Sequence, residues 1–173
     1  MNHEFCNALL AEKKNESIPD DFDWFGPLIG EWDFMWTTSV GQENEKTEKG
    51  EWIFSRILNG CGIQDLFIIP PRKECVRLGI PNTEYGTTIR TFNIFNKGWE
   101  VYYTAMGEYT RLSARKLGDK IELTEEHGKM KWVFSEIEEN SFHWQNIMQN
   151  QEDEWKVVCD CKATRKLEVE SEK

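Results

Sequence analysis

Apolar and polar residues alternate along most of this chain, and short turn-forming sequences interrupt the alternation. In the first such segment Trp32, Phe34 and Trp36 share one face, because successive side chains of a β-strand point to opposite faces. Asn59-Gly60 and Gly118-Asp119 are sequences typical of tight hairpin turns. The pattern predicts about ten strands, near residues 30–38, 49–58, 62–69, 85–95, 99–106, 109–117, 119–126, 128–137, 140–149 and 154–165.

Short connections make sequential strands antiparallel neighbours, and ten such strands must form a sandwich or close into a barrel that has no exposed edges. A meander favours the barrel. We therefore predict an all-β fold, a single antiparallel meander β-barrel of about ten strands with a short N-terminal helix. The chain of 173 residues has the size of one domain. We divide it into a helix and connector at 1–21, the barrel at 22–166 and a charged tail at 167–173.

The longest connection between predicted strands runs from Pro70 to Thr83 and contains three prolines, which exclude it from a central strand. We expect an irregular, flexible flap there. The N-terminal helix is predicted from Phe5, Leu9 and Leu10, which recur at roughly helical spacing.

The chain is acidic, with a formal net charge of −10 and a pI near 4.9. Such a field repels phosphate backbones and anionic lipid surfaces, so we expect neither a nucleic acid nor a membrane as partner. No segment has the roughly 20 apolar residues of a membrane helix, and Met1 to Glu16 lack the pattern of a signal peptide. The expected location is the cytoplasm. There the five scattered cysteines stay reduced, and their spacing predicts neither disulfides nor a zinc site.

Both ends of the predicted barrel carry a recognisable motif. The segment Phe25–Trp32 ends in Gly30-Glu31-Trp32, a G-x-W tripeptide at the start of the first strand, and Ala163-Thr164-Arg165 ends the last strand. Further shared features are Tyr85-Gly86-Thr87-Thr88-Ile89-Arg90, Trp132-x-Phe134-x-x-Ile137 and Phe142-x-Trp144. In these features the chain resembles bacterial lipocalin-like (calycin) proteins of uncharacterised function, which are fold-level relatives of nitrobindins and fatty-acid-binding proteins.

The resemblance implies that Arg165 packs over Trp32 and closes one end of the barrel. It implies no catalytic residue. The chain lacks the fuller glycine pattern that follows the G-x-W tripeptide in nitrobindins, and it has no histidine near its end. A haem role is therefore not carried over, and no cofactor is expected.

Strand parity gives an independent check of this closure. If Arg165 points inward on the last strand, the residues at every second position before it must also point inward. The inward set is then Trp155, Val157, Cys159, Cys161 and Ala163, whereas the outward set Lys156, Val158, Asp160, Lys162 and Thr164 is mostly polar. The two faces thus differ as a barrel requires.

A ten-stranded barrel is wide enough to keep an internal cavity. By parity its lumen receives Trp36, Trp52, Phe54, Trp99, Val101, Tyr103, Trp132, Phe134, Phe142, Trp144, Asn146 and Met148. Such a set suits either a pocket for a hydrophobic molecule or a filled core, and eight tryptophans with indole N–H groups to satisfy favour the pocket. The predicted ligand-binding residues are Trp36, Trp52, Arg90, Tyr103, Trp132, Trp144 and Asn146.

Arg90 has two orientations open to it. On the parity of Phe92 and Ile94 it points inward, where it needs an acidic partner or an anionic ligand such as a carboxylate. In the alternative it faces solvent. His143 should point outward with Gln145, and the histidines do not have metal-ligand spacing, so no metal site is expected.

The leading functional hypothesis is a non-enzymatic protein that holds a hydrophobic or aromatic, possibly carboxylated, molecule in the barrel lumen. No nucleophile motif is present, so no catalytic residue is assigned. One alternative is a small barrel enzyme of the lyase or isomerase type that uses Tyr102, Tyr103, Arg90 and Glu108. Another is a homodimeric interaction module with a filled core, which associates through an outward patch of Val133, Ile147 and Val158.

Overall fold

The computed structural model describes residues 3–166, so the predicted tail at 167–173 lies outside the described residues. The helices are α1 (His3–Leu9) and α2 (Arg72–Leu78), with two 3-10 turns, η1 (Asp20–Phe22) and η2 (Gly26–Leu28). The strands are β1 (Leu10–Ala11), β2 (Gly30–Thr38), β3 (Lys46–Ile57), β4 (Gly62–Ile69), β5 (Glu84–Asn93), β6 (Gly98–Ala105), β7 (Glu108–Leu117), β8 (Lys120–Glu125), β9 (Met130–Ser135), β10 (Ser141–Gln149) and β11 (Trp155–Arg165).

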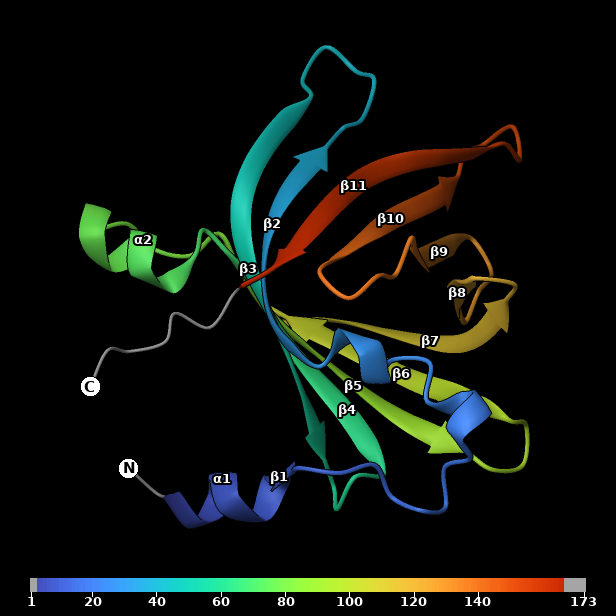
Figure 1. Ribbon diagram of the computed structural model, residues 1–173. Helices are drawn as coiled ribbons and strands as arrows, with labels where there is room; N and C mark the ends of the chain where they lie inside the picture. The colour runs from blue at the N-terminus through green and yellow to red at the C-terminus, as the bar shows by residue number, and fades with distance from the viewer. Residues whose placement is uncertain (1–2, 167–173) are drawn as a thin grey trace.

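Strands β2 to β11 form a closed antiparallel barrel in which each strand pairs with its sequence neighbours. The last strand returns beside the first, with Arg165 opposite Trp32, and this pairing completes the ring. Strand β1 lies outside the ring and adds to β3 through Leu10 and Ile57. Figure 1 shows the strands around one interior, with both α-helices outside it. The predicted barrel class and short N-terminal helix are confirmed.

The connector before β2 closes one end of the barrel. Its side chains Phe25 and Leu28 are fully buried, and Phe25 packs edge-on against Trp99 with ring centroids 5.5 Å apart. Burying each of these side chains stabilises the fold by roughly 1.5–3 kcal/mol. The indole of Trp99 donates a hydrogen bond of 2.8 Å to the Phe22 carbonyl, which ties the connector to the opposite wall.

Arg165 completes this closed end. Its guanidinium carbon lies 4.1 Å from the centre of the Trp32 ring. The guanidinium donates hydrogen bonds to the carbonyls of Ile29 at 2.7 Å, Pro27 at 2.8 Å and Glu139 at 2.6 Å. A cation that both stacks on an indole and satisfies three loop carbonyls holds the connector against the strand ends.

The inward face predicted for β11 is wrong at its start. Asn146 pairs with Cys159, but Ile147 pairs with Val157, so Val158 is an extra residue that forms a bulge. The bulge reverses the strand parity before it. Trp155 consequently lies on the outer surface, 42% exposed, with the Lys131 ammonium 4.8 Å from its ring.

The connection between β4 and β5 contains helix α2 instead of an irregular flap. Glu51 on β3 accepts hydrogen bonds from the backbone of Arg72 at 2.8 Å and from its guanidinium at 2.7 Å, and Lys166 donates to the same carboxylate at 3.0 Å. Burial raises the pKa of Glu51, but these hydrogen bonds and the Lys166 charge lower it to about 2. The carboxylate therefore anchors α2 to the barrel wall.

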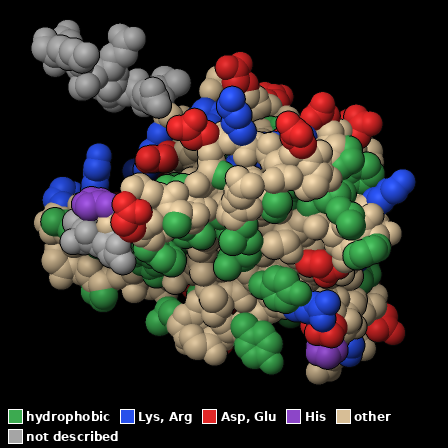
Figure 2. All heavy atoms as spheres, turned by 90° about the horizontal axis from the view of Figure 1, so that it is seen from below, with side chains coloured by type: hydrophobic (Ala, Val, Ile, Leu, Met, Phe, Trp, Pro, Cys, Tyr) green, Lys and Arg blue, Asp and Glu red, His purple; other side chains and the backbone are tan. Residues whose placement is uncertain are grey.

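Of the three residues predicted to form an apolar outer patch, Val133 is buried, whereas Ile147 and Val158 are half-buried. Val133 is 8% exposed, because Glu122 and Gln145 flank it on the neighbouring strands with longer side chains. Figure 2 shows the molecule from below, a view in which hydrophobic side chains reach the surface in several small groups among polar surface. In residues 3–166 no helix is long and apolar enough to cross a membrane.

Candidate functional site

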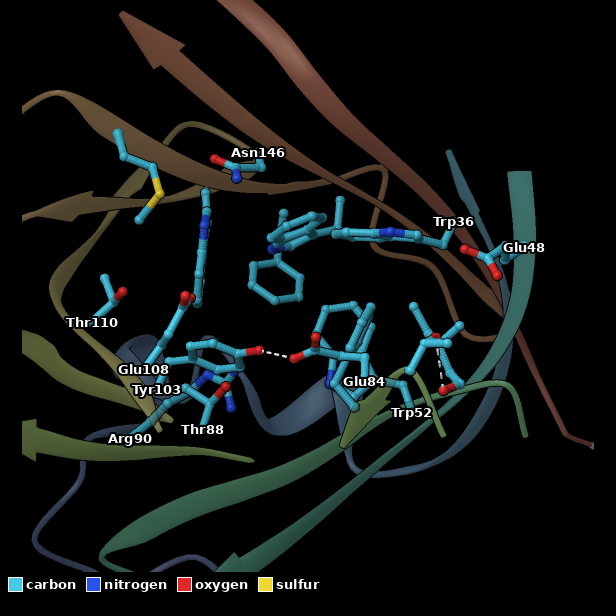
Figure 3. A pocket seen from close by; sticks show the side chains of 17 residues that line it. Trp36, Glu48, Trp52, Glu84, Thr88, Arg90, Tyr103, Glu108, Thr110 and Asn146 are labelled. Atoms are coloured by element: carbon cyan, nitrogen blue, oxygen red, sulfur yellow. Dashed lines mark hydrogen bonds between the residues drawn. The ribbon is translucent and has the colours of Figure 1, made fainter. Parts of the chain in front are cut away.

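A cavity of about 440 Å³ lies in the half of the barrel opposite the closed end. Its walls come from eight strands and from the connection that precedes β5. The lining residues are Trp36, Glu48, Trp52, Phe67, Ile69, Thr83, Glu84, Thr88, Arg90, Tyr103, Glu108, Thr110, Met130, Trp132, Phe134, Trp144 and Asn146. All seven predicted ligand-binding residues are among them, and Figure 3 shows their side chains around one space.

Sequence reasoning missed the polar residues at the rim of this cavity. Glu84 and Thr88 share the parity of Arg90 on β5, and Glu48 shares that of Trp52 on β3. Extending the alternation to the strand ends would have found them. Charged residues near turns ordinarily face solvent, so residue type alone gives no signal for these inward positions.

Four aromatic side chains form a continuous wall of the cavity, which we call the aromatic wall. Trp36 stacks on Trp144 with ring centroids 5.4 Å apart, and Trp144 lies 5.6 Å from Trp132. Tyr103 meets Trp132 edge-on at 5.3 Å. These offset and T-shaped contacts are the favourable geometries for aromatic pairs, so the wall is pre-formed.

Three tryptophans of the cavity have buried indole N–H groups without a hydrogen-bond partner in residues 3–166, namely Trp52, Trp132 and Trp144. The side-chain oxygen of Asn146 is likewise buried and has no hydrogen-bond partner in residues 3–166. By contrast, the indoles of Trp32 at the closed end and Trp24 beside it each donate to a backbone carbonyl at 2.8 Å. An unpaired buried donor costs roughly 1–3 kcal/mol, so the cavity walls hold donors suited to an acceptor.

Arg90 points inward and is 1% exposed, which resolves its two predicted orientations. Its Nη2 atom lies 2.6 Å from Oδ2 of Asp65, whose side chain is fully buried on β4. The contact is an ion pair without hydrogen-bond geometry, because Asp65 Oδ2, Arg90 Nε and Arg90 Nη1 have no hydrogen-bond partner within residues 3–166. The acidic partner of Arg90 is therefore a residue of the barrel and not a ligand.

Of the two residues predicted to share the inward parity of Arg90, Phe92 packs against the core, but Ile94 does not point inward. Ile94 is 58% exposed, because β5 ends at Asn93 and Ile94 already belongs to the following turn. The guanidinium of Arg90 instead lies among aromatic rings, with its central carbon 5.0 Å from the ring centre of Phe25 and 5.4 Å from that of Phe54. Arg90 thus forms the floor between the cavity and the closed end.

A tyrosine and a glutamate interact at the cavity mouth. The Tyr103 hydroxyl donates a hydrogen bond to Oε1 of Glu84, as Figure 3 shows. Burial raises the pKa of Tyr103 far above its ordinary value, and the hydrogen bond to Glu84 and nearby carboxylates raise it further. Tyr103 therefore keeps its proton and remains a donor.

The position of Tyr103 depends on a glycine in the adjacent strand. A Cβ atom at Gly86 would lie 2.7 Å from Cε2 of Tyr103 and 2.8 Å from its hydroxyl oxygen. Any side chain at this position would push the phenol toward the cavity. Gly86 is thus the residue that lets Tyr103 lie flat against β5 beside Glu84.

No cysteine or histidine of residues 3–166 lines the cavity. Burial raises the pKa of Cys159 to about 11, and it also raises the pKa of Cys161 well above its ordinary value, so both thiols stay protonated. His143 lies on the outer face as predicted, with Nε2 2.6 Å from Asp160. Of the residues named for the enzyme alternative, Tyr103, Arg90 and Glu108 line the cavity, whereas Tyr102 is 47% exposed on the outer face. Residues 3–166 contain no group of three or more potential metal ligands.

Comparison with known proteins supports the fold. No family model and no curated protein matches the chain. The solved structure "Crystal Structure of Rv2717c from M. tuberculosis" is similar with a TM-score of 0.59 and 10% identity, over 90% of this chain and all 100% of that chain. A redesigned beta barrel matches over 82% of this chain and 94% of that chain, with 10% identity and a TM-score of 0.35. The chain therefore has an antiparallel β-barrel fold that it shares with Rv2717c at low sequence identity.

Proposed function

We propose that this protein binds a small hydrophobic or aromatic molecule inside the barrel. The observation that carries the proposal is the 440 Å³ cavity whose wall contains three buried indole N–H groups without a partner in residues 3–166. The volume lies within the range of small-molecule sites, about 300–1,000 Å³. An apolar wall with a few donors selects a ligand that has a flat apolar body and at least one acceptor atom.

The lipocalin-like assignment is part of this proposal. It is supported by the closed ten-stranded meander, the Gly30-x-Trp32 start and the Arg165 side chain stacked on Trp32. Carboxylated ligands lose their main support, because Arg90, the one cation among the described residues that line the cavity, is neutralised by Asp65. The filled-core alternative is disfavoured by the cavity itself.

The proposal is tested by filling the cavity from within. Thr110 lines the cavity from β7, whereas Ser113 lies on the same strand and faces solvent. Thr110→Trp should weaken binding of the neutral fluorescent probe N-phenyl-1-naphthylamine at least tenfold, and Ser113→Trp should leave it unchanged. Both variants must first show wild-type circular dichroism. Equal probe affinity in the two variants would contradict lumen binding.

A second experiment identifies the natural ligand class. Native mass spectrometry of the protein purified from its own host is compared with the same sample after denaturation. A reproducible additional mass that disappears on denaturation is the expected result, and its accurate mass would give an elemental composition.

A further inference from the structure

The charged side chains of the cavity are predominantly acidic. Glu48, Glu84 and Glu108 line it, and Arg90 is the single basic residue among the lining residues of the described chain. Because Arg90 is paired with Asp65, it contributes no net positive charge. The cavity therefore presents an excess of negative charge to whatever enters it.

Two of these carboxylates have no ion-pair partner within residues 3–166. Glu48 pairs with Lys46 at 2.9 Å, but neither Glu84 nor Glu108 lies within 4.0 Å of a basic group there. Glu84 accepts a hydrogen bond from Tyr103, which holds its carboxylate at one place in the mouth. A fixed carboxylate inside a partly enclosed cavity attracts a cation more strongly than one in bulk water.

The aromatic wall reaches this carboxylate. Tyr103, which donates a hydrogen bond to Glu84, is in edge contact with Trp132. Trp132 contacts Trp144, and Trp144 stacks on Trp36. The faces of indole and phenol rings carry negative partial charge and bind ammonium groups, tightest when several rings surround the cation. An aromatic wall that ends at a carboxylate thus combines two attractions for the same kind of group.

We infer that the ligand of this cavity is an organic amine or quaternary ammonium compound with an apolar body. Its cationic group lies between Glu84, Glu108 and the aromatic wall, and an acceptor atom on its body meets the indole N–H groups of Trp52 and Trp144. This inference rests on the proposed function and names the class of its ligand. The two indoles are 4% and 5% exposed, and their unpaired donors mark the deeper end of the same site independently of the carboxylates.

Three probes with the same ring and different charge test the inference. They are 2-(1-naphthyl)ethylamine, which is cationic at pH 7, 2-(1-naphthyl)ethanol, which is neutral, and 1-naphthylacetate, which is anionic. Isothermal titration calorimetry should show that the amine binds at least tenfold more tightly than the alcohol, and the acid more weakly than both. If the alcohol or acid binds as tightly as the amine, amine selectivity is refuted while lumen binding stands. If the protein binds none of these three probes and does not bind N-phenyl-1-naphthylamine, both the proposed function and this inference are refuted.

Single substitutions test which carboxylates cause the preference for the amine. Glu84→Gln keeps an acceptor for Tyr103 but removes the charge, so the amine should fall to nearly the affinity of the alcohol, while the affinity of the alcohol itself stays constant. Glu108→Gln should act in the same direction. Glu16→Gln, in the exposed connector before the barrel, removes the same charge from outside the cavity and should leave all three affinities unchanged. A loss in Glu16→Gln equal to that in Glu84→Gln would assign the preference to the overall field of the protein and overturn the site.

Discussion

The ion pair between Arg90 and Asp65 should be the most strongly coupled pair of side chains in the barrel. Its Nη2 and Oδ2 atoms are 2.6 Å apart, and the two side chains are 1% and 0% exposed. With an effective dielectric constant of about 20, Coulomb's law gives about 6 kcal/mol of attraction at this distance. Removing one partner leaves the other charge buried and unpaired, so Asp65→Asn or Arg90→Met should each destabilise the fold by about 3–5 kcal/mol.

A double-mutant cycle measures this coupling. Urea unfolding, followed by tryptophan fluorescence, should show that Asp65→Asn/Arg90→Met costs at least about 2 kcal/mol less than the sum of the single variants. The pair Arg56–Asp23 is a matched control, because its Nη2–Oδ2 distance is also 2.6 Å but its side chains are 11% and 21% exposed. Its coupling should be smaller. If the losses in unfolding free energy of Asp65→Asn and Arg90→Met simply add in the double variant, the view that Asp65 neutralises Arg90 within the barrel is refuted.

Three further predictions concern the surroundings of the site. Gly86→Ala should destabilise the fold by about 1–3 kcal/mol in thermal unfolding, because its Cβ would lie 2.7 Å from Tyr103; an unchanged Tm would contradict this. The pKa of Glu51 is lowered from 4.5 to about 2, so its carboxylate stabilises the fold above pH 4.5 and loses that contribution as the pH falls toward 2. In urea titrations Glu51→Gln should therefore reduce the free energy of unfolding by about 2 kcal/mol at pH 7 and by much less at about pH 2.5. Arg165→Met should cost about 3 kcal/mol, measured in the same way, whereas a loss below about 1 kcal/mol would mean that its stacking on Trp32 does not hold the closed end.

The barrel could be predicted from sequence because strand alternation and hairpin turns are local signals. Trp32, Phe34 and Trp36 alternate with polar or less buried neighbours, and one such strand already divides inside from outside. Closure followed from the need to remove edges, and the pairing of Arg165 with Trp32 completes it. The same rule failed at Trp155, because a bulge at Val158 depends on the register of β10 and leaves no mark in the alternation of β11.

The helix α2 was missed for a different physical reason. Its seven residues are too short for a periodic apolar pattern, and prolines on either side favour an irregular connection. What stabilises it is the contact of Arg72 with Glu51, which lies 21 positions earlier in the chain. No pattern within 70–83 contains that information.

The composition of the cavity wall was predictable, but its charge was not. Parity placed Trp144 in the lumen and left two orientations open for Arg90, and an inward Arg90 required either an acidic partner or an anionic ligand. In the structure the net charge of the cavity is negative, because Asp65 on β4 pairs with Arg90 and because Glu84 and Glu108 line the cavity mouth. The charge that a barrel cavity presents to a ligand is therefore set by side-chain pairs between neighbouring strands, which the alternation along one strand cannot reveal. The inferred selectivity for amines depends on the strand register that places Asp65 beside Arg90 and keeps this ion pair intact.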